Sequence, residues 1–105
     1  MKHIMHLDNK AFNLIKEGEK KIELRLYDEK RQAFKEKDVI ELINRLSNER
    51  VTVEIENIYK YNNFEELYKC LDNKLIIYSL EEMEKFYSKD EQNKFGVIGI
   101  KIKLL

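Results

Sequence analysis

The segment GEKKIELR, residues 18 to 25, places a carboxylate and a guanidinium two positions apart. If the segment forms a strand, Glu23 and Arg25 lie on one face of it, about 6.5–7 Å apart along the strand. Arginine offers a fixed fork of N–H donors and glutamate offers only acceptors, so the pair can bind the polar edge of a planar ligand. Lys20, in the preceding turn, can bind phosphate, or can take part in a reaction if burial lowers its pKa.

A second interpretation of the same residues needs no ligand. Lys21, Glu23 and Arg25 can form the solvated face of a strand and make ion pairs with the neighbouring strand. Residue types and spacing alone favour this solvated face over a binding site. The elements around the segment therefore have to be considered.

The predicted elements on both sides position this segment. Asp8 is a good N-cap for a helix that continues to about Glu17, with apolar residues at helical spacing. Gly18 then follows the helix at a position that usually needs a positive φ, which costs glycine less than any other residue. Over residues 21–27 apolar and polar residues alternate, which predicts a strand with one apolar face formed by Ile22, Leu24 and Leu26.

The rest of the chain predicts a strand over residues 2–7, a helical turn over residues 28–34 and a hairpin of residues 39–44 and 50–61. The alternation of the second hairpin strand changes phase near Glu56 and Asn57, which predicts a bulge that bends the strand. Asn63 is expected to cap a helix. Ser79 and Ser88, each with a glutamate three residues later, predict capping boxes for helices over residues 80–87 and 89–94. A strand over residues 95–104 completes the chain.

This order of elements indicates an α+β fold, because helices and strands do not alternate regularly as in parallel βαβ winding. We expect a small mixed, partly open β-barrel with short helices packed around it. A chain of 105 residues is expected to form one domain over residues 1–105.

Composition and charge limit the class of protein. Twenty Lys and Arg balance twenty Asp and Glu, so no net field attracts the protein to nucleic acid, and such a role needs a local basic patch. The sequence has no apolar run that predicts a signal peptide or a membrane span. The single cysteine, Cys70, excludes an internal disulfide. We therefore predict a soluble, cytoplasmic protein that does not act at a membrane.

Neither a metal nor a cofactor is expected. His3 and His6 are three positions apart on a predicted strand, so they lie on opposite faces and cannot bind one metal ion there. Two histidines and one cysteine do not form a zinc site of the usual kind.

Basic and aromatic residues elsewhere are compatible with nucleic acid without specifying it. Four basic residues follow the candidate strand and could track phosphates, but acidic residues alternate with them: Lys30, Arg31, Lys35 and Lys37. Tyr59 and Tyr61 share a strand face and suit either base stacking or ordinary packing.

The pattern G-x-K-x-x-E-x-R, formed by Gly18, Lys20, Glu23 and Arg25, resembles the ASCH (activating signal cointegrator homology) domain family of small PUA-like β-barrels. The resemblance extends over most of the chain. It includes the preceding helix, the run LRLYDEKR that ends at Arg31, the triplet FYS that contains Tyr87, and the run FGVIGI near the C-terminus. On these segments the chain is similar to single-domain bacterial members.

The resemblance implies a barrel cleft with RNA or a nucleotide-like ligand as the partner. The residues expected to line it are Gly18, Lys20, Glu23, Arg25, Arg31 and Tyr87. In this role Arg25 and Lys20 would contact phosphate or a base edge. Glu23 would accept from a base amino group or hold Arg25 in place. A subunit whose cleft binds a protein is a further possibility.

An alternative from the same resemblance is a small hydrolase. Some members are amidohydrolases that deacetylate N4-acetylcytidine with a lysine, a threonine and a glutamate. Lys20 matches the lysine, but Glu23 replaces the threonine and only Asp72 lies near the third position. Other members are ribonucleases, in which Lys20 and Glu23 would be the catalytic acid and base.

Overall fold

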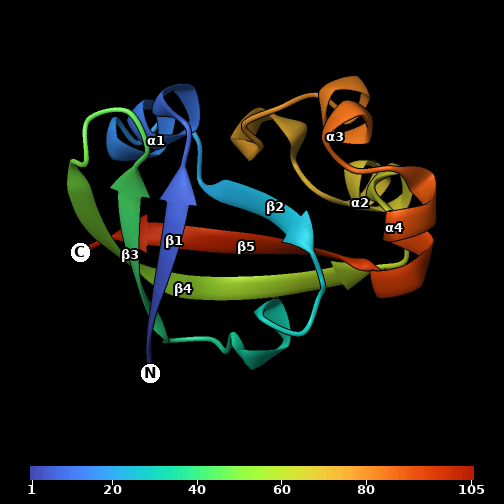
Figure 1. The fold of residues 1–105 in the computed structure, drawn as a ribbon, viewed down its shortest axis with the longest axis horizontal. Coiled ribbons are helices and arrows are strands. Elements are labelled where there is room, and N and C mark those ends of the chain that lie inside the picture. Colours follow the sequence, from blue (N-terminus) through green and yellow to red (C-terminus); the bar gives the residue numbers. More distant parts are fainter.

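The protein is built on one curved sheet of five strands, and the computed structural model describes all of residues 1–105. The strand order is β1-β3-β4-β5-β2; β1 and β3 are parallel, and the other neighbours are antiparallel. The sheet curls into a half-barrel, which confirms the α+β, PUA-like, partly open barrel expected from the sequence (Figure 1). The strands are β1 Lys2–Leu7, β2 Ile22–Leu26, β3 Val39–Asn44, β4 Arg50–Tyr61 and β5 Val97–Leu104.

Four short α-helices and two 3-10 turns connect the strands. Helix α1 lies beside the ends of β1 and β3, whereas α2, α3 and α4 gather at the other side of the sheet (Figure 1). The helices are α1 Asn9–Lys16, α2 Phe64–Cys70, α3 Leu80–Phe86 and α4 Lys89–Phe95, and the 3-10 turns are η1 Arg31–Ala33 and η2 Asn73–Leu75.

The predicted helix caps are confirmed. Asp8 and Asn63 each accept a hydrogen bond from the backbone of the first helical turn. Ser79 and Ser88 both form complete capping boxes with the glutamate three residues later. These local bonds satisfy backbone N–H groups that have no partner inside the helix, which is why helices this short begin where they do.

The helical turn that Asp28 was expected to cap is present in shortened form, since residues 31–33 form the 3-10 turn η1 and the Asp28 carboxylate accepts from the Arg31 backbone at 3.1 Å. One strand boundary differs from the prediction. Strand β5 begins at residue 97 because Gly96, with a φ of +74°, ends α4. The segment between η2 and α3 forms no full strand and contributes one bridge, between Ile22 and Ile76. The predicted bulge in β4 is present between residues 55 and 57.

Apolar side chains pack on both faces of the sheet. The larger cluster lies inside the half-barrel under α1 and includes Phe12, Ile98 and Ile100. The smaller one lies under α2 and α3 and takes the apolar face of β2: Ile22, Leu24 and Leu26. Paired residues of neighbouring strands point to the same side, and Glu23 and Arg25 pair with Ile100 and Ile98. The polar face of β2 therefore points into the half-barrel.

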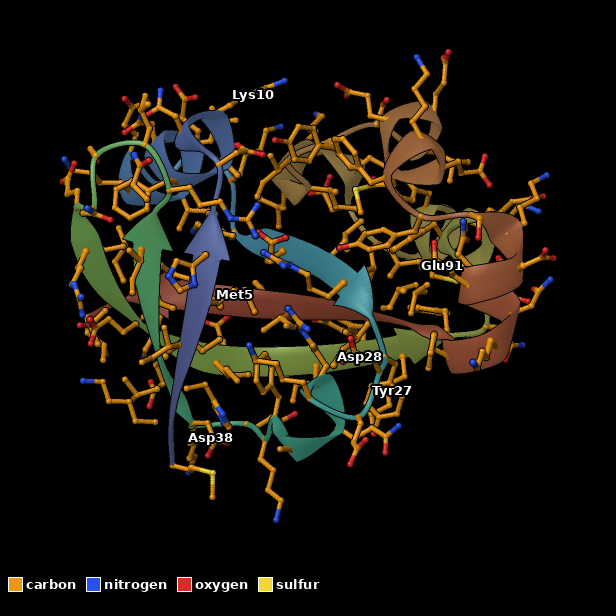
Figure 2. The ribbon with its side chains drawn as sticks, in the orientation of Figure 1. Met5, Lys10, Tyr27, Asp28, Asp38 and Glu91 are labelled. Atoms are coloured by element: carbon orange, nitrogen blue, oxygen red, sulfur yellow. The ribbon has the colours of Figure 1, made fainter.

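A hydrogen-bonded cluster around Asp38 holds the N-terminus against the start of β3. The Asp38 carboxylate accepts from the Met1 amino group at 3.2 Å, from His3 Nε2 at 2.8 Å and from the Lys35 backbone at 3.1 Å. The hydrogen bond with His3 is the main reason that the pKa of Asp38 is lowered. This cluster lies at the opposite end of the sheet from Lys10 of α1 (Figure 2). No helix is long and apolar enough to cross a membrane.

Gly99 allows α2 to pack closely on the sheet. A Cβ at this position would lie 3.2 Å from Leu71 Cδ1 and 3.5 Å from methyl groups of Leu24 and Leu67. A larger side chain would have to push the leucines or the helix away from β5.

We predict that Gly99→Val lowers the free energy of unfolding by about 1–3 kcal/mol, because it overpacks this contact. Chemical denaturation followed by circular dichroism measures the change. Gly99→Ala adds only the first carbon and should cost less. Equal stability of Gly99→Val and the wild type would contradict the contact.

Candidate functional site

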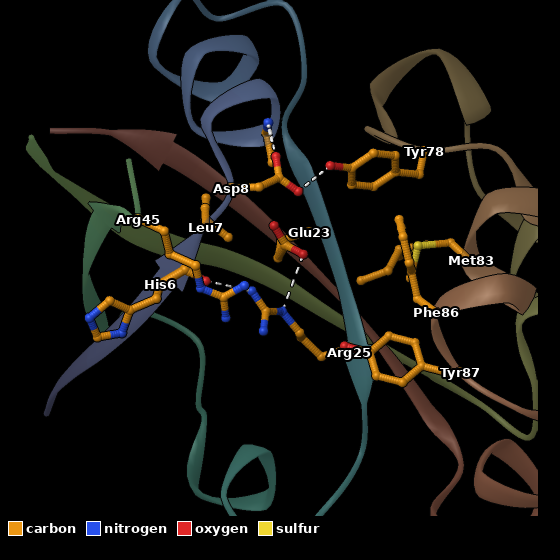
Figure 3. A pocket seen from close by; sticks show the side chains of 12 residues that line it. His6, Leu7, Asp8, Glu23, Arg25, Arg45, Tyr78, Met83, Phe86 and Tyr87 are labelled. Carbon is orange, nitrogen blue, oxygen red and sulfur yellow. Dashed lines mark hydrogen bonds and ion pairs between the residues drawn. The ribbon is translucent and has the colours of Figure 1, made fainter. Parts of the chain in front are cut away.

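A pocket of about 290 Å³ opens where the two edge strands of the sheet, β1 and β2, face each other without pairing. Arg25 reaches across this gap from β2, and its Nη2 donates to the His6 carbonyl of β1 at 3.0 Å (Figure 3). The pocket is lined by His6, Leu7, Asp8, Ala11, Glu23, Leu24, Arg25, Arg45, Tyr78, Met83, Phe86 and Tyr87.

Glu23 is the most deeply buried acid of the pocket, with only 8% of the residue exposed. Its Oε1 accepts from Arg25 Nε at 3.3 Å, but its buried Oε2 has no hydrogen-bond partner. Burial raises the pKa of Glu23, the guanidinium of Arg25 opposes this shift, and the charge of Asp8 adds to it. Buried polar atoms are nearly always paired, so this Oε2 oxygen is available to accept a hydrogen bond from outside the chain.

Asp8 connects the two sides of the pocket. One oxygen caps α1 by accepting from the Ala11 backbone at 2.8 Å, and the other accepts from the Tyr78 hydroxyl (Figure 3). Burial and this hydrogen bond to Asp8 raise the pKa of the Tyr78 hydroxyl, so it stays protonated and continues to donate. The bond ties the start of α1 to the segment that leads into α3.

Aromatic and apolar side chains form the wall opposite Asp8. Met83, Phe86 and Tyr87 come from α3 and its C-terminal end. Phe86 contacts the Tyr78 ring edge-on, with centroids 5.0 Å apart, and remains 54% exposed. The ring of Tyr87 packs at 5.9 Å against Phe64 of α2. The pocket thus combines a polar floor with an aromatic wall.

The structure brings three of the six expected ligand-binding residues together: Glu23, Arg25 and Tyr87 all line this pocket. Gly18 and Lys20 do not line it. They border a different pocket of about 270 Å³, and Lys20 Nζ donates to the Lys74 carbonyl at 2.7 Å.

Arg31 also lies outside the pocket between β1 and β2. It belongs to η1 and pairs with the Asp28 carboxylate at 3.3 Å. The four motif residues are divided as well, since Glu23 and Arg25 line the pocket between β1 and β2 whereas Gly18 and Lys20 border the other pocket.

The alternative of a solvated strand face is wrong for Glu23 and Arg25. Their side chains are only 10% and 15% exposed, and the ion pair is formed within β2 rather than across strands. Only Lys21 is exposed as that alternative expected. The physical reason is that β2 is buried on both faces, by the helices on one side and by the half-barrel on the other.

Several pocket residues were not predicted as site residues. The sequence marks Asp8 only as a helix cap, and nothing local distinguishes Tyr78, His6, Arg45 or Phe86. Their common feature is the placement of β1, the β3–β4 loop and α3 around the gap, which depends on strand pairing between distant residues. The chain contains no cluster of three His, Cys, Asp or Glu side chains that could hold a metal ion.

The half-barrel with a pocket across its open side defines a PUA-like class of protein. The model of the ASCH domain family matches residues 5–105, and the chain belongs to that family. ASCH domains are a nucleic-acid-binding type of domain. The sequence resemblance is thereby confirmed at the level of the family.

Solved structures support the assignment. The hypothetical protein PH0355 is 33% identical, with a TM-score of 0.86 over 100% of both chains. Protein PF0455 from Pyrococcus furiosus is 34% identical, with a TM-score of 0.77 over 100% of this chain and 98% of that one. An ASCH protein from Zymomonas mobilis shares the fold alone: it is 12% identical, with a TM-score of 0.77 over 98% of this chain and 70% of its own. No curated protein matches the sequence.

The raised pKa of Glu23 predicts a pH-dependent effect of Glu23→Gln on stability. The unfolded carboxyl titrates near its ordinary value of 4.5, and the folded one titrates above it. The folded state therefore binds more protons between these two values, and wild-type stability falls as pH rises through them. Gln lacks this loss, so the stability of Glu23→Gln relative to wild type should increase as pH rises above about 4.5.

Urea denaturation between acid and neutral pH measures this difference. Glu36→Gln, in the exposed turn before β3, is the control and should show no such trend. A relative stability of Glu23→Gln that stays constant or falls with pH would contradict burial as the dominant effect on Glu23.

Proposed function

We propose that this protein is an RNA- or nucleotide-binding module whose ligand site is the pocket between β1 and β2. The observation that carries the proposal is the buried, unpartnered Oε2 of Glu23 beside the guanidinium of Arg25. An acceptor and a cluster of donors at the base of a partly apolar pocket suit a ligand that is flat and polar at one edge. A nucleobase has this character, and the ASCH family is consistent with it.

Each pocket residue has a role in this proposal. Arg25 uses Nε and Nη2 within the protein and keeps further N–H groups for a ligand. Glu23 accepts a ligand N–H through Oε2, and Tyr87 supplies an aromatic surface. Gly18, Lys20 and Arg31 enter the proposal only as flanking groups that contact RNA outside the pocket, since they do not line it.

We predict that Arg25→Ala weakens RNA binding by at least about tenfold, a loss of about 1.4 kcal/mol, because it removes the donors of the site. Fluorescence anisotropy with a labelled RNA oligomer measures the affinity. Arg50→Ala is the matched control, since Arg50 is exposed and its only ion pair is with Glu41 at the surface. Its affinity should remain close to wild type apart from a small uniform loss.

Arg25→Ala leaves Glu23 buried without its cation, which costs stability. A double variant, Glu23→Gln with Arg25→Gln, keeps a neutral pair in the same place, and its thermal melt shows whether it is folded. RNA affinity that is unchanged in the folded double variant would overturn the proposed site.

A small hydrolase that acts on RNA or on a modified nucleoside such as N4-acetylcytidine is the second candidate. The observation that favours it is Glu23 itself, whose pKa is raised in a pocket that also contains Asp8. Such a carboxyl stays protonated to higher pH and suits a general acid. Lys20, the other expected catalytic residue, points to the Lys74 carbonyl instead. This candidate therefore rests on Glu23 alone.

We expect the protein to bind RNA and to release it intact, and to leave N4-acetylcytidine unchanged. Gel analysis of end-labelled RNA and chromatography of the nucleoside measure this. If product forms with the wild type and is lost in Glu23→Gln, the hydrolase replaces the binding module. Lys20→Ala tests the motif lysine beside it, and activity lost only in that variant would place the chemistry at the other surface.

A further inference from the structure

The charges of the pocket favour a neutral ligand group. Two carboxylates, Asp8 and Glu23, and two guanidiniums, Arg25 and Arg45, line it, so neither sign is in excess. A phosphate placed against the free Oε2 of Glu23 would be repelled and would leave this oxygen without a donor. A neutral ring with an N–H next to an acceptor satisfies both Glu23 and Arg25.

The depth of the pocket restricts how such a ring arrives. The Glu23 side chain is 10% exposed, so a ligand has to insert its polar edge to reach it. A base inside a duplex has this edge paired and stacked, and turning it out costs a few kcal/mol. An unpaired base of a single strand avoids this cost.

Phe86 provides a second contact at the mouth of the pocket. Its ring is held edge-on against Tyr78 and is half exposed, in contrast to the buried Met83 beside it. The ammonium of Lys10 lies 5.1 Å from the centre of the Tyr78 ring, so this tyrosine contacts both a cation and the exposed Phe86 ring. Exposed rings and nearby cations together bind single strands, the rings by stacking with bases and the cations by contacting the backbone.

We propose that the pocket holds one unpaired base of a single-stranded RNA, with its polar edge between Glu23 and Arg25, while the neighbouring base stacks on Phe86. This inference rests on the proposed RNA-binding function and names the form of RNA that the site accepts. It assigns Phe86 as a contact that the sequence motif does not contain.

The test compares one short labelled RNA oligomer, as a single strand and annealed to its complement, in fluorescence anisotropy. We expect the single strand to bind at least about tenfold more tightly. Phe86→Leu should weaken single-strand binding by about fivefold or more, the effect of losing one stacked base. Leucine keeps the helix propensity and the apolar contact with Tyr78, so the variant is expected to fold.

Phe95→Leu is the matched control. Phe95 is also a partly exposed aromatic residue at the end of a short helix and lies near a lysine, but it does not line the pocket. Equal affinity for both forms of RNA, or equal loss in the two leucine variants, would overturn this inference. If the duplex binds as tightly as the single strand and its binding still requires Arg25, this inference is overturned and the proposed function stands. If neither form of RNA binds, the inference and the proposed RNA-binding function are both overturned.

Discussion

The gap between the two edge strands β1 and β2 is the feature on which the rest of the site depends. A closed barrel would pair these strands through their backbones, but here a side chain spans them, since Arg25 donates to the His6 carbonyl. Because the polar face of β2 points into the half-barrel, beside β5 and α1, both charges of the Glu23–Arg25 pair are largely removed from water. A buried charge that lacks a hydrogen-bond partner costs free energy, so the pocket favours a ligand that supplies the partner.

Asp8 shows how local and long-range structure use one side chain. Its N-cap bond fixes the start of α1, and its bond with Tyr78 holds the segment before α3 at the opposite side of the pocket. Burial raises the pKa of Glu23, and the charge of Asp8 adds to this rise. A helix cap, a wall of the pocket and the electrostatics of the floor are therefore linked, so a change at Asp8 would alter all three together.

Much of this fold was predictable because helix caps and bulges depend on residues that are close in sequence. Asp8, Ser79 and Ser88 have the side-chain oxygen that a cap requires, and the phase change near Asn57 marked the bulge in β4. Within β1, by contrast, two apolar residues are adjacent, and the sequence does not show which one enters the core: Met5 is buried, whereas Ile4 is 50% exposed. Alternation makes one of two neighbours point outward, but only pairing with β3 decides which one.

The candidate site was predictable where it lies within one strand and not where it joins several elements. The spacing of Glu23 and Arg25 placed them on one face, but the burial of that face depends on β5 and α1, which are distant in sequence. Lys20 is only three residues from Glu23, yet the turn after Gly18 directs it to Lys74 and a different surface. Proximity in a motif therefore does not ensure a shared site. The unpaired oxygen of Glu23, which no spacing rule reveals, is the observation on which the proposed ligand site rests.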